Sequence, residues 1–307
     1  MPGKPGRIGV VPVELTTEQL EQDDVGGFYA HYHDRIAEKR FNSPFWLRRY
    51  AHRTIHSLIA SHIRAGATVL DAGCGEGILS LLLARNGALV TGMDISGPNI
   101  AAAQEMAREA SLNVRFVVGD GLKLPFGDDS FDVVVSSHVI EHLTDPIRGL
   151  RELHRVSRAT VVLAMPTCLN PAAWALLGRD AYWKLTRRSA WAVPLGLGRT
   201  VVALALGREG VDEGYAGQDD LPHVWRFPWV MAGMAREAGF RVSVIEAGPL
   251  LLPYAAQYSK SLRRIQPKLD RLGSHRLIRN LGFGTHLLAE KQAAFQAPAP
   301  STPGQPE

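Results

Sequence analysis

The chain has 307 residues, of which 46% are hydrophobic and 21% charged, and its formal net charge at pH 7 is +4. This is ordinary globular composition, sufficient for one large domain or for a core domain with an elaborated lid. The charge is too small to predict nucleic-acid binding, and the two cysteines, Cys74 and Cys168, exclude a disulfide framework and fit a reducing cytosol.

No segment of the sequence predicts membrane insertion. Met1–Arg7 is rich in Pro and Gly and lacks the apolar core of a secretion signal. A spanning helix needs about 18 uninterrupted apolar residues. Ser189–Gly207 comes nearest, but Pro194 and Arg199 interrupt it. We therefore expect a cytoplasmic protein, with contact at a membrane surface left open.

The first part of the chain predicts an arm and one helix. Residues 1–40 are expected to be a loose N-terminal arm. Phe41–Ile63 predicts a helix, because four apolar residues recur there at helical spacing: Ile55, Leu58, Ile59 and Ile63.

From residue 67 onward, short apolar runs alternate with helical segments. Five runs are predicted to be strands: Ala67–Leu70, Ala88–Met93, Val114–Val118, Phe131–Ser136 and Thr160–Met165. The intervening helices include Ile78–Arg85, a helix capped by Ser96 and one that begins at Asp145-Pro146. Such alternation predicts a parallel sheet covered by helices, with ligands outside the carboxyl ends of the strands.

The alternation is interrupted after the fifth strand. Pro166–Pro222 carries many aromatic residues among glycines and basic residues, and it is too long for an ordinary connection. We interpret residues 167–225 as a lid on the acceptor side. The core then resumes over residues 226–292. Its expected elements are a helix at Pro228–Ala238 and strands at Phe240–Glu246 and Gly284–Glu290.

The predicted fold class is therefore α/β. We expect a Rossmann-like, doubly wound, mostly parallel seven-stranded sheet with helices on both faces and a lid insertion after strand five. The ligand-binding core begins with residues 41–166. Residues 293–307, rich in Ala, Pro, Ser and Gln, are expected to be a disordered tail.

The strongest local signal is Val69–Gly77, which reads Val-Leu-Asp-Ala-Gly-Cys-Gly-Glu-Gly between a strand and a helix. Glycines allow positive φ and a close approach of a ligand to the backbone. The dinucleotide fingerprint Gly-x-Gly-x-x-Gly would place the third glycine one residue later. Asp71 would also sit badly beside a pyrophosphate but well beside an ammonium. This chemistry favours S-adenosylmethionine, which has a sulfonium, an amino acid moiety and no phosphate, over NAD.

Acidic residues follow the next two strands as well. Asp94 comes about twenty residues after the glycine loop, where a carboxylate can accept hydrogen bonds from ribose hydroxyls. Asp120 follows the third strand, and its side chain could receive the adenine amine. Any one aspartate alone would be read as a loop cap. Three at successive strand ends favour a nucleoside site.

As a set, these residues resemble the class I S-adenosylmethionine-dependent methyltransferases. Val69–Gly77 matches motif I of that family, Asp94 its ribose-binding acid and Asp120-Gly121 its adenine-proximal acid. The resemblance covers residues 45–166 and is closest to the group with the ubiquinone-biosynthesis O-methyltransferases and many natural-product and sugar methyltransferases. It implies a donor site with these residues: Asp71, Gly73, Cys74, Gly75, Asp94, Ile95, Asp120, Gly121 and Ser137. Of these, Cys74 is interpreted as simply a small loop residue.

In the resembling family, the loop Ser136–Pro146 lies beside the donor methyl. In-line methyl transfer needs the acceptor atom behind the methyl, and a hydroxyl acceptor benefits from a base. His142 and His138 are the two candidate catalytic residues, because histidine has a suitable pKa. The alternative is that Glu141 and His142 only cap the loop.

A metal in this loop is a further alternative. His138, Glu141 and His142 have the spacing i, i+3, i+4, so one helical turn would cluster them as ligands of a divalent ion. The resemblance implies acidic residues with a metal here in some ubiquinone-type members, but His138 stands where an acid would be expected. We therefore name S-adenosylmethionine as the cofactor and assign no metal ligands.

Several aromatic and basic residues are expected around the site. His223 and Trp225 could reach over it from the lid. By resemblance, a second group would cover the donor pocket: Tyr29, Tyr32, His33, Arg48 and Tyr50. The apolar Ala172–Gly207 and the cationic Lys260–Arg279 would suit an anionic membrane surface or a lipid-linked acceptor. The alternative is a buried cap and a solvated basic helix.

The sequence thus predicts an S-adenosylmethionine-dependent methyltransferase. The leading hypothesis is O-methylation of a small-molecule, sugar or lipid-linked acceptor by in-line transfer, with a histidine assisting deprotonation. One alternative is C- or N-methylation of a natural product by positioning alone. Another is a non-catalytic donor-binding regulator. The oligomeric state stays open.

Overall fold

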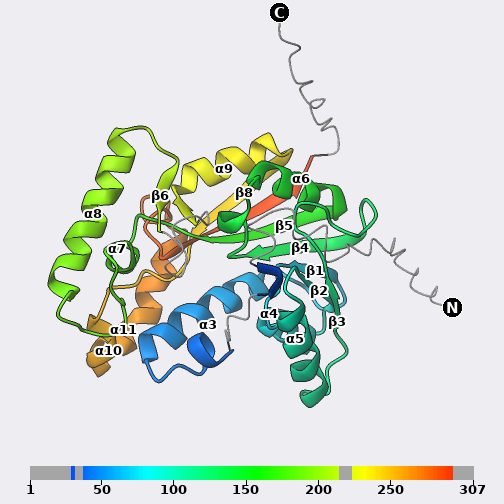
Figure 1. The fold of residues 1–307 in the computed structure, drawn as a ribbon, viewed down its shortest axis with the longest axis horizontal. Coiled ribbons are helices and arrows are strands. Elements are labelled where there is room, and N and C mark those ends of the chain that lie inside the picture. The colour runs from blue at the N-terminus through cyan, green and yellow to red at the C-terminus, as the bar shows by residue number, and fades with distance from the viewer. Residues whose placement is uncertain (1–28, 32–36, 214–222, 293–307) are drawn as a thin grey trace, which may run out of the picture.

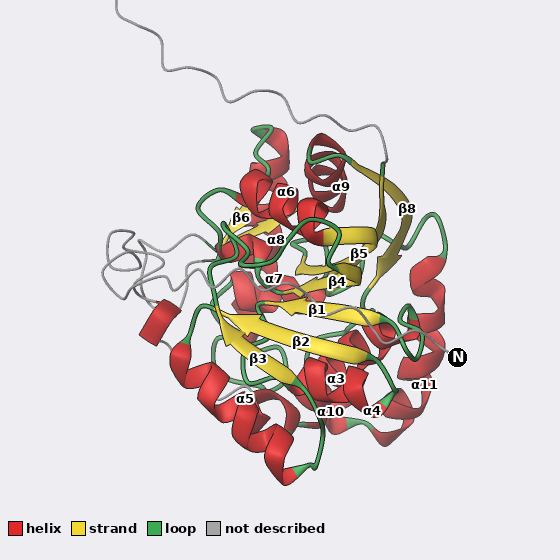
Figure 2. Cartoon of the chain, turned by 90° about the vertical axis from the view of Figure 1, so that its right-hand side faces the viewer, coloured by secondary structure: helices red, strands yellow, loops and turns green. Residues whose placement is uncertain are grey.

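The computed structural model describes residues 29–31, 37–213 and 223–292. Its centre is a seven-stranded sheet of order β3-β2-β1-β4-β5-β9-β8 (Figure 2). The strands are β1 (Thr68–Ala72), β2 (Leu89–Asp94), β3 (Arg115–Val118), β4 (Phe131–Ser137), β5 (Ser157–Pro166), β8 (Phe240–Ala247) and β9 (Gly284–Lys291). Neighbouring strands from β3 to β5 are parallel, and only β9 runs antiparallel to its two neighbours. The predicted fold class is confirmed.

Helices cover both faces of this sheet (Figure 1). The five that pack on the sheet are α3 (Trp46–Ser61), α4 (Ile78–Arg85), α5 (Gly97–Glu109), α6 (Pro146–Val156) and α9 (Pro228–Glu237). Successive strand residues point to opposite faces. Val69 accordingly packs in one core cluster with α3 and α4, while Leu70 packs in a second cluster with α6 and α9. A strand buried on both faces is apolar at nearly every position, which is why the central strands were predicted correctly.

The predicted helix starts within the core are confirmed. Ser96 caps α5 by accepting a hydrogen bond from the Asn99 N–H, and Asp145 caps α6 by accepting one from the Arg148 N–H. The helix predicted over Phe41–Ile63 is shorter at its N-terminus. A short π-helix, η1 (Ala37–Phe41), ends there, and α3 begins after Pro44. The residue before a proline disfavours the helical conformation, which explains the break.

Between β5 and α9 the chain forms α7 (Pro171–Leu177), α8 (Ser189–Ala205) and a two-stranded ribbon of β6 (Gly210–Asp212) and β7 (Val224–Arg226). These elements occupy the range interpreted as the lid. Between β8 and β9 lie α10 (Ala255–Tyr258), α11 (Lys260–Asp270) and a 3-10 turn, η3 (Arg271–Ser274). The predicted tail and most of the predicted arm fall outside the described residues. Within the described part of the chain, no helix combines the length and apolar content needed to cross a bilayer.

Candidate active site

A cavity of about 540 Å³ opens at the carboxyl ends of β1, β2 and β4. From β1 the chain continues to β2 and β3 on one side of the sheet and later returns to β4 and β5 on the other, so the adjacent ends of β1 and β4 leave a crevice between diverging loops. Every residue predicted from the sequence to bind the cofactor or act in catalysis lines this cavity: Asp71, Gly73, Cys74, Gly75, Asp94, Ile95, Asp120, Gly121, Ser137, His138 and His142.

The glycine loop after β1 is folded tightly against its neighbours. The N–H groups of Gly73 and Cys74 both donate to the Met93 carbonyl, at 2.7 and 2.8 Å. Gly73 has a φ of +81°, and a Cβ on it would lie 2.1 Å from Cγ2 of Val139 in the loop after β4. A side chain at this position would therefore force the two loops apart, so the crevice depends on glycine here.

Asp71 is buried at the base of this loop, with 1% of its surface exposed. Its Oδ2 accepts a hydrogen bond of 2.6 Å from Ser80 Oγ on α4. Burial raises the pKa of Asp71 to about 6, and the nearby carboxyl of Asp94 acts in the same direction. A buried carboxylate of this kind is suited to a cationic partner, because a cation would compensate the charge that water cannot reach.

Asp94 links the two loops that follow β1 and β2. Its Oδ2 accepts from the Gly75 N–H at 2.8 Å, and its Oδ1 accepts from the Ser96 N–H at 2.9 Å. Burial raises the pKa of this carboxyl. Each carboxylate oxygen has two lone pairs: Oδ2 keeps one for a hydroxyl donor from a ligand, and the second on Oδ1 is used only by a long contact of 3.5 Å from Asn99 Nδ2, which a ligand hydroxyl could replace. Asp120 lies further along the same edge, where its Oδ1 accepts from the Leu122 N–H at 2.8 Å.

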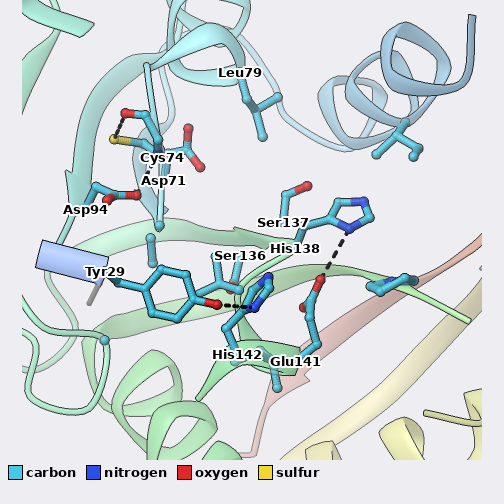
Figure 3. A pocket seen from close by; sticks show the side chains of 18 of the residues that line it. Tyr29, Asp71, Cys74, Leu79, Asp94, Ser136, Ser137, His138, Glu141 and His142 are labelled. Carbon is cyan, nitrogen blue, oxygen red and sulfur yellow. Dashed lines mark hydrogen bonds and ion pairs between the residues drawn. The ribbon is translucent and has the colours of Figure 1, made fainter. Parts of the chain in front are cut away.

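His142 lies at the centre of the site, in the 3-10 turn η2 (Ile140–His142) that follows β4 (Figure 3). The Tyr29 hydroxyl is 2.8 Å from His142 Nδ1. The ring of His223, from the lid, stacks on the His142 ring at 4.4 Å between centroids and an angle of 10°. Burial lowers the pKa of His142 to about 3, although Glu141 acts in the opposite direction. His142 is therefore a neutral imidazole at physiological pH.

Glu141 is a buried carboxylate among three histidines. Only 3% of its surface is exposed, and His138 Nδ1 lies 3.3 Å from its Oε1. Apart from this contact, neither carboxylate oxygen has a hydrogen-bond partner among the described residues. Burial alone would raise the pKa of Glu141, but the hydrogen bond with His138 and the positive charges that His138, His142 and His223 carry when protonated outweigh it and lower the pKa to about 2. The site therefore contains a buried negative charge that can stabilise a developing positive charge beside it.

The histidine–glutamate spacing does not form the helical turn predicted from the sequence. His138 has a φ of +58° and precedes η2, so it does not share a turn with His142. The group with metal-ligand geometry is instead Glu141, His142 and His223, whose ligand atoms lie within 4.8 Å of one another. The ring of His223 is also held by Glu213 Oε2 at 2.7 Å from Nδ1 and by the Trp225 indole N–H at 3.3 Å from Nε2.

The remaining wall of the cavity combines aromatic and basic side chains. The residues expected to reach over the site, His223 and Trp225, both line it, as do Tyr29 and Arg48. Tyr50 instead donates a hydrogen bond to Asp270 and does not line the cavity. Tyr32 and His33 lie outside the described residues. The Arg48 guanidinium lies 4.2 Å from the ring centroid of Trp183.

The lining residues that sequence reasoning missed include two histidines and three aromatic residues: His52, His56, Tyr182, Trp183 and Phe283. The abundance of His and Arg in α3 was a signal for the first two, because such side chains are unusual on a helix that packs beside a sheet. The aromatic residues come from the α7–α8 connection and from just before β9. Nothing in their local pattern distinguished them from core residues.

The fold and this cavity define a class of protein: a Rossmann-like α/β domain with a nucleoside-type site at its switch point. Residues 70–165 match a family model described as a methyltransferase domain. This match agrees with the S-adenosylmethionine-dependent methyltransferase core that the motifs predicted over residues 45–166.

Curated relatives resemble part of the chain. Over 131 residues it is 35% identical to the ubiquinone biosynthesis O-methyltransferase of Pseudomonas fluorescens, covering 40% of this chain and 55% of that protein. Over 86 residues it is 38% identical to the enzyme of the same name from Coxiella burnetii, covering 28% of this chain and 37% of that protein. The chain thus spans about half the length of the first of these relatives and 37% of the second.

Solved structures share the fold at low identity. Magnesium protoporphyrin IX methyltransferase from Synechocystis, solved with bound S-adenosylhomocysteine, is 17% identical, with a TM-score of 0.51 over 85% of this chain and 97% of that one. A S-adenosylmethionine-dependent methyltransferase from Methanosarcina mazei is 21% identical, with a TM-score of 0.50 over 76% and 96% of the two chains. The likeness therefore extends over the fold beyond residues 70–165.

Proposed function

We propose that this protein binds S-adenosylmethionine in the cavity and transfers its methyl group to a hydroxyl oxygen of a small-molecule acceptor. One observation carries the proposal: three carboxylates and a glycine loop line the same cavity as the half-buried Tyr29–His142 pair and the buried Glu141. The first set suits the donor and the second suits proton removal from an acceptor. The likeness to O-methyltransferases supports oxygen as the atom methylated.

On the donor side, each polar part of S-adenosylmethionine has a matching group. The amino acid moiety carries an ammonium, for which the buried Asp71 is the partner. Asp94 has lone pairs for the two ribose hydroxyls, and Asp120 can accept a hydrogen bond from the adenine amine. Gly73, with a φ of +81°, forms the turn that brings this backbone to the cavity, and its missing side chain lets the loop pack on Val139. The donor has no phosphate and needs no cationic cradle.

On the transfer side, His142 acts as a weak but sufficient base. As the acceptor oxygen attacks the methyl carbon, the carbon–sulfur bond breaks and the oxygen becomes positively charged, so its proton becomes strongly acidic. A neutral imidazole with a pKa of about 3 can take that proton. Glu141 stabilises the imidazolium that forms, and Tyr29 orients the ring. The products are S-adenosylhomocysteine, the methyl ether and a proton on His142.

The walls beyond His142 favour an acceptor with a flat, apolar body. Tyr182, Trp183, Trp225 and Phe283 present aromatic surface to this part of the cavity. Such surfaces stack well on rings and bury apolar area. The guanidinium of Arg48, held over Trp183, provides one site for a negatively charged substituent.

A divalent cation is a second candidate component. Glu141, His142 and His223 fit one in ligand type and spacing, and the carboxylate oxygens of Glu141 are otherwise poorly satisfied. A metal bound there would lower the pKa of an acceptor hydroxyl. The contacts of His223 with Glu213 and Trp225 compete with that role, so we assign proton removal to His142.

Isothermal titration with S-adenosylhomocysteine and with NAD tests the donor assignment. We expect micromolar binding of S-adenosylhomocysteine and no binding of NAD. Binding of NAD alone would overturn the proposal.

Release of S-adenosylhomocysteine from S-adenosylmethionine in the presence of a panel of phenols, alcohols and amines tests the acceptor atom. Retained turnover after dialysis against EDTA assigns proton removal to His142, whereas loss that Mg²⁺ or Zn²⁺ restores assigns it to a metal.

A further inference from the structure

The outward surface of α8 carries no polar side chain. All eleven exposed positions between residues 190 and 206 are apolar or glycine. We call them the outer face of α8: Ala190, Trp191, Pro194, Leu195, Leu197, Gly198, Val201, Val202, Leu204, Ala205 and Leu206. Trp191 alone is 77% exposed. A surface helix normally presents charged or polar residues to water, and a helix that is apolar all round is normally covered.

The other side of α8 is already occupied. Gly196 packs so closely against α7 that a Cβ on it would lie 2.0 Å from the Trp174 carbonyl oxygen, and Ala192 contacts Gly178 in the same way. In Figure 1, α7 lies between α8 and the sheet, and α8 forms an outer edge of the molecule. The outer face is therefore the side of α8 that points away from the protein.

The width of this face decides between possible occupants. At 3.6 residues per turn, the eleven positions of the outer face span an arc of about 200° around the helix axis. Leu204 lies at one edge of this arc and Leu206 at the other. Packing against one other helix covers a stripe only a little wider than about 100°. A second copy of the chain docking through one element would leave much of the arc in water. The boundary between lipid headgroups and acyl chains can cover all of it.

Basic residues lie at the N-terminal end of the same helix. Lys184, Arg187 and Arg188 are exposed in the connection that leads into α8. The acid nearest to them in sequence, Asp180, is held by the hydroxyls of Thr186, Ser189 and Tyr254. This end also contacts α10, because the Leu185 N–H donates to the Tyr258 hydroxyl at 3.1 Å, which brings Lys260 into the same neighbourhood. Cations beside an apolar face complement anionic headgroups.

We propose that the outer face of α8 docks on an anionic lipid bilayer, with the helix lying in the membrane surface and Lys184, Arg187 and Arg188 contacting headgroups. The helix is too short and too interrupted by Pro194 to span the bilayer, in keeping with a peripheral contact. The inference does not depend on methyl transfer.

The docking face and the cavity wall are connected along the chain. Tyr182 and Trp183, which line the cavity, precede Lys184 directly in the connection between α7 and α8. If the proposed function holds, docking of α8 would bring the connection between α7 and α8, which carries these two residues, close to a bilayer that holds a lipid-soluble acceptor.

Vesicle flotation of the full chain tests the docking. The probes are vesicles of phosphatidylcholine alone and of phosphatidylcholine mixed with phosphatidylglycerol. We expect binding to the mixed vesicles, and a loss of about tenfold or more in Val202→Glu, because a carboxylate resists transfer into the apolar layer. Leu89→Glu is the matched control: Leu89 is 59% exposed and Val202 53% exposed, but Leu89 begins β2, outside α8. The control should bind as the wild type does.

A second pair of variants separates charge from apolar contact. Arg187→Ala with Arg188→Ala should weaken binding to the mixed vesicles and make it less sensitive to salt. Absence of binding to both vesicle types would overturn the proposal, as would equal binding by Val202→Glu. A wild-type dimer in analytical ultracentrifugation that Val202→Glu converts to a monomer would assign the face to a second copy instead. Titration with S-adenosylhomocysteine reports on the proposed function separately, so either idea can fail alone.

Discussion

His142 is the residue whose replacement most directly tests the transfer step. His142→Gln keeps a polar side chain of similar reach but has no basic lone pair of comparable strength. We expect turnover to fall by about 100-fold or more, within the range for loss of a general base. Affinity for S-adenosylhomocysteine should stay within about twofold, because the donor carboxylates are elsewhere in the cavity. Steady-state kinetics and calorimetry on the same preparation measure both.

The control for this substitution is His62→Gln. His62 pairs with Glu246 at 3.3 Å and does not line the cavity. Its replacement should leave turnover unchanged. Full turnover in His142→Gln would remove the assigned role, and a matching loss of donor affinity would mean that the variant had disturbed the loop.

Asp71 should make donor binding depend on pH. Burial raises the pKa of this carboxyl to about 6, so it is ionised above pH 6 and becomes neutral below. Only the ionised form pairs with the donor ammonium. The dissociation constant for S-adenosylhomocysteine should therefore rise as the pH falls from 7 to 5, by at most about tenfold per unit below pH 6. For folding the sign is opposite: a raised carboxyl pKa contributes stability at low pH that is lost as the pH rises through about 6.

Asp71→Asn isolates this effect. The amide is close to the carboxylate in size and can keep a hydrogen bond with Ser80, but it does not titrate. We expect weaker binding at pH 7 and little change between pH 7 and 5. An affinity of the wild-type protein that stays constant over that range would contradict the pairing of Asp71 with the ammonium.

At the scale of elements, the contact between α7 and α8 depends on glycine. A Cβ on Gly196 would lie 2.0 Å from a backbone oxygen of α7, whereas a Cβ on Gly198 would meet nothing within 4 Å. Alanine is a better helix former than glycine by about 1 kcal/mol. Gly198→Ala should therefore stabilise the protein by up to that amount. Gly196→Ala should destabilise it by about 1–3 kcal/mol, because the two helices must separate.

Urea denaturation followed by tryptophan fluorescence measures the two variants side by side. They differ by two positions in one helix, so helix propensity cancels between them. Equal stability of the two variants would show that the helices can separate without cost and that the lid is loosely attached.

The elements that the sequence predicted best are those with a simple environment. The central strands are buried on both faces, so each is an apolar run in the sequence. The predicted C-terminal end of each of these strands lies within two residues of its end in the structure, as for β4, which ends at Ser137 and was predicted to end at Ser136. The lid helices were not predicted individually. In α8, apolar residues occupy nearly all sides, together with Pro194, two glycines and four alanines, so no helical stripe distinguished it from a buried segment.

The site was predictable only where topology alone brings residues together. Asp71, Asp94 and Asp120 follow parallel neighbouring strands, so their proximity follows from the order of the sheet. The stacking of His223 on His142 and the contact of Tyr29 depend on how the lid and the N-terminal segment fold back over the sheet. Spacing along the chain carried no information on those contacts, nor on the positive φ that keeps His138 out of the turn of η2.

Across the whole molecule, buried histidines should make the fold sensitive to acid. Burial is the largest cause of a lowered pKa in five histidines, two of which lie in α3: His52, His56, His142, His154 and His286. In the unfolded chain each would take up a proton near pH 6.5. The folded protein excludes those protons, so its stability should fall as the pH falls below 6.5.

His286 provides the sharpest test because it lies inside the sheet, in β9 between β5 and β8, with 3% of its surface exposed. Burial lowers its pKa to about 3. Its neutral form therefore contributes stability above pH 6.5 that is lost, at about 1.4 kcal/mol per pH unit, as the pH falls toward 3. Between pH 7 and 5, the free energy of unfolding of His286→Gln should fall by about 2 kcal/mol less than that of the wild type. Urea titrations at both pH values measure the difference, so a constant destabilisation of the variant cancels.

His275→Gln is the control, because that ring is exposed to water when folded as well as when unfolded. Equal losses in the wild type and in His286→Gln would mean that the folded sheet accommodates a charge at this position.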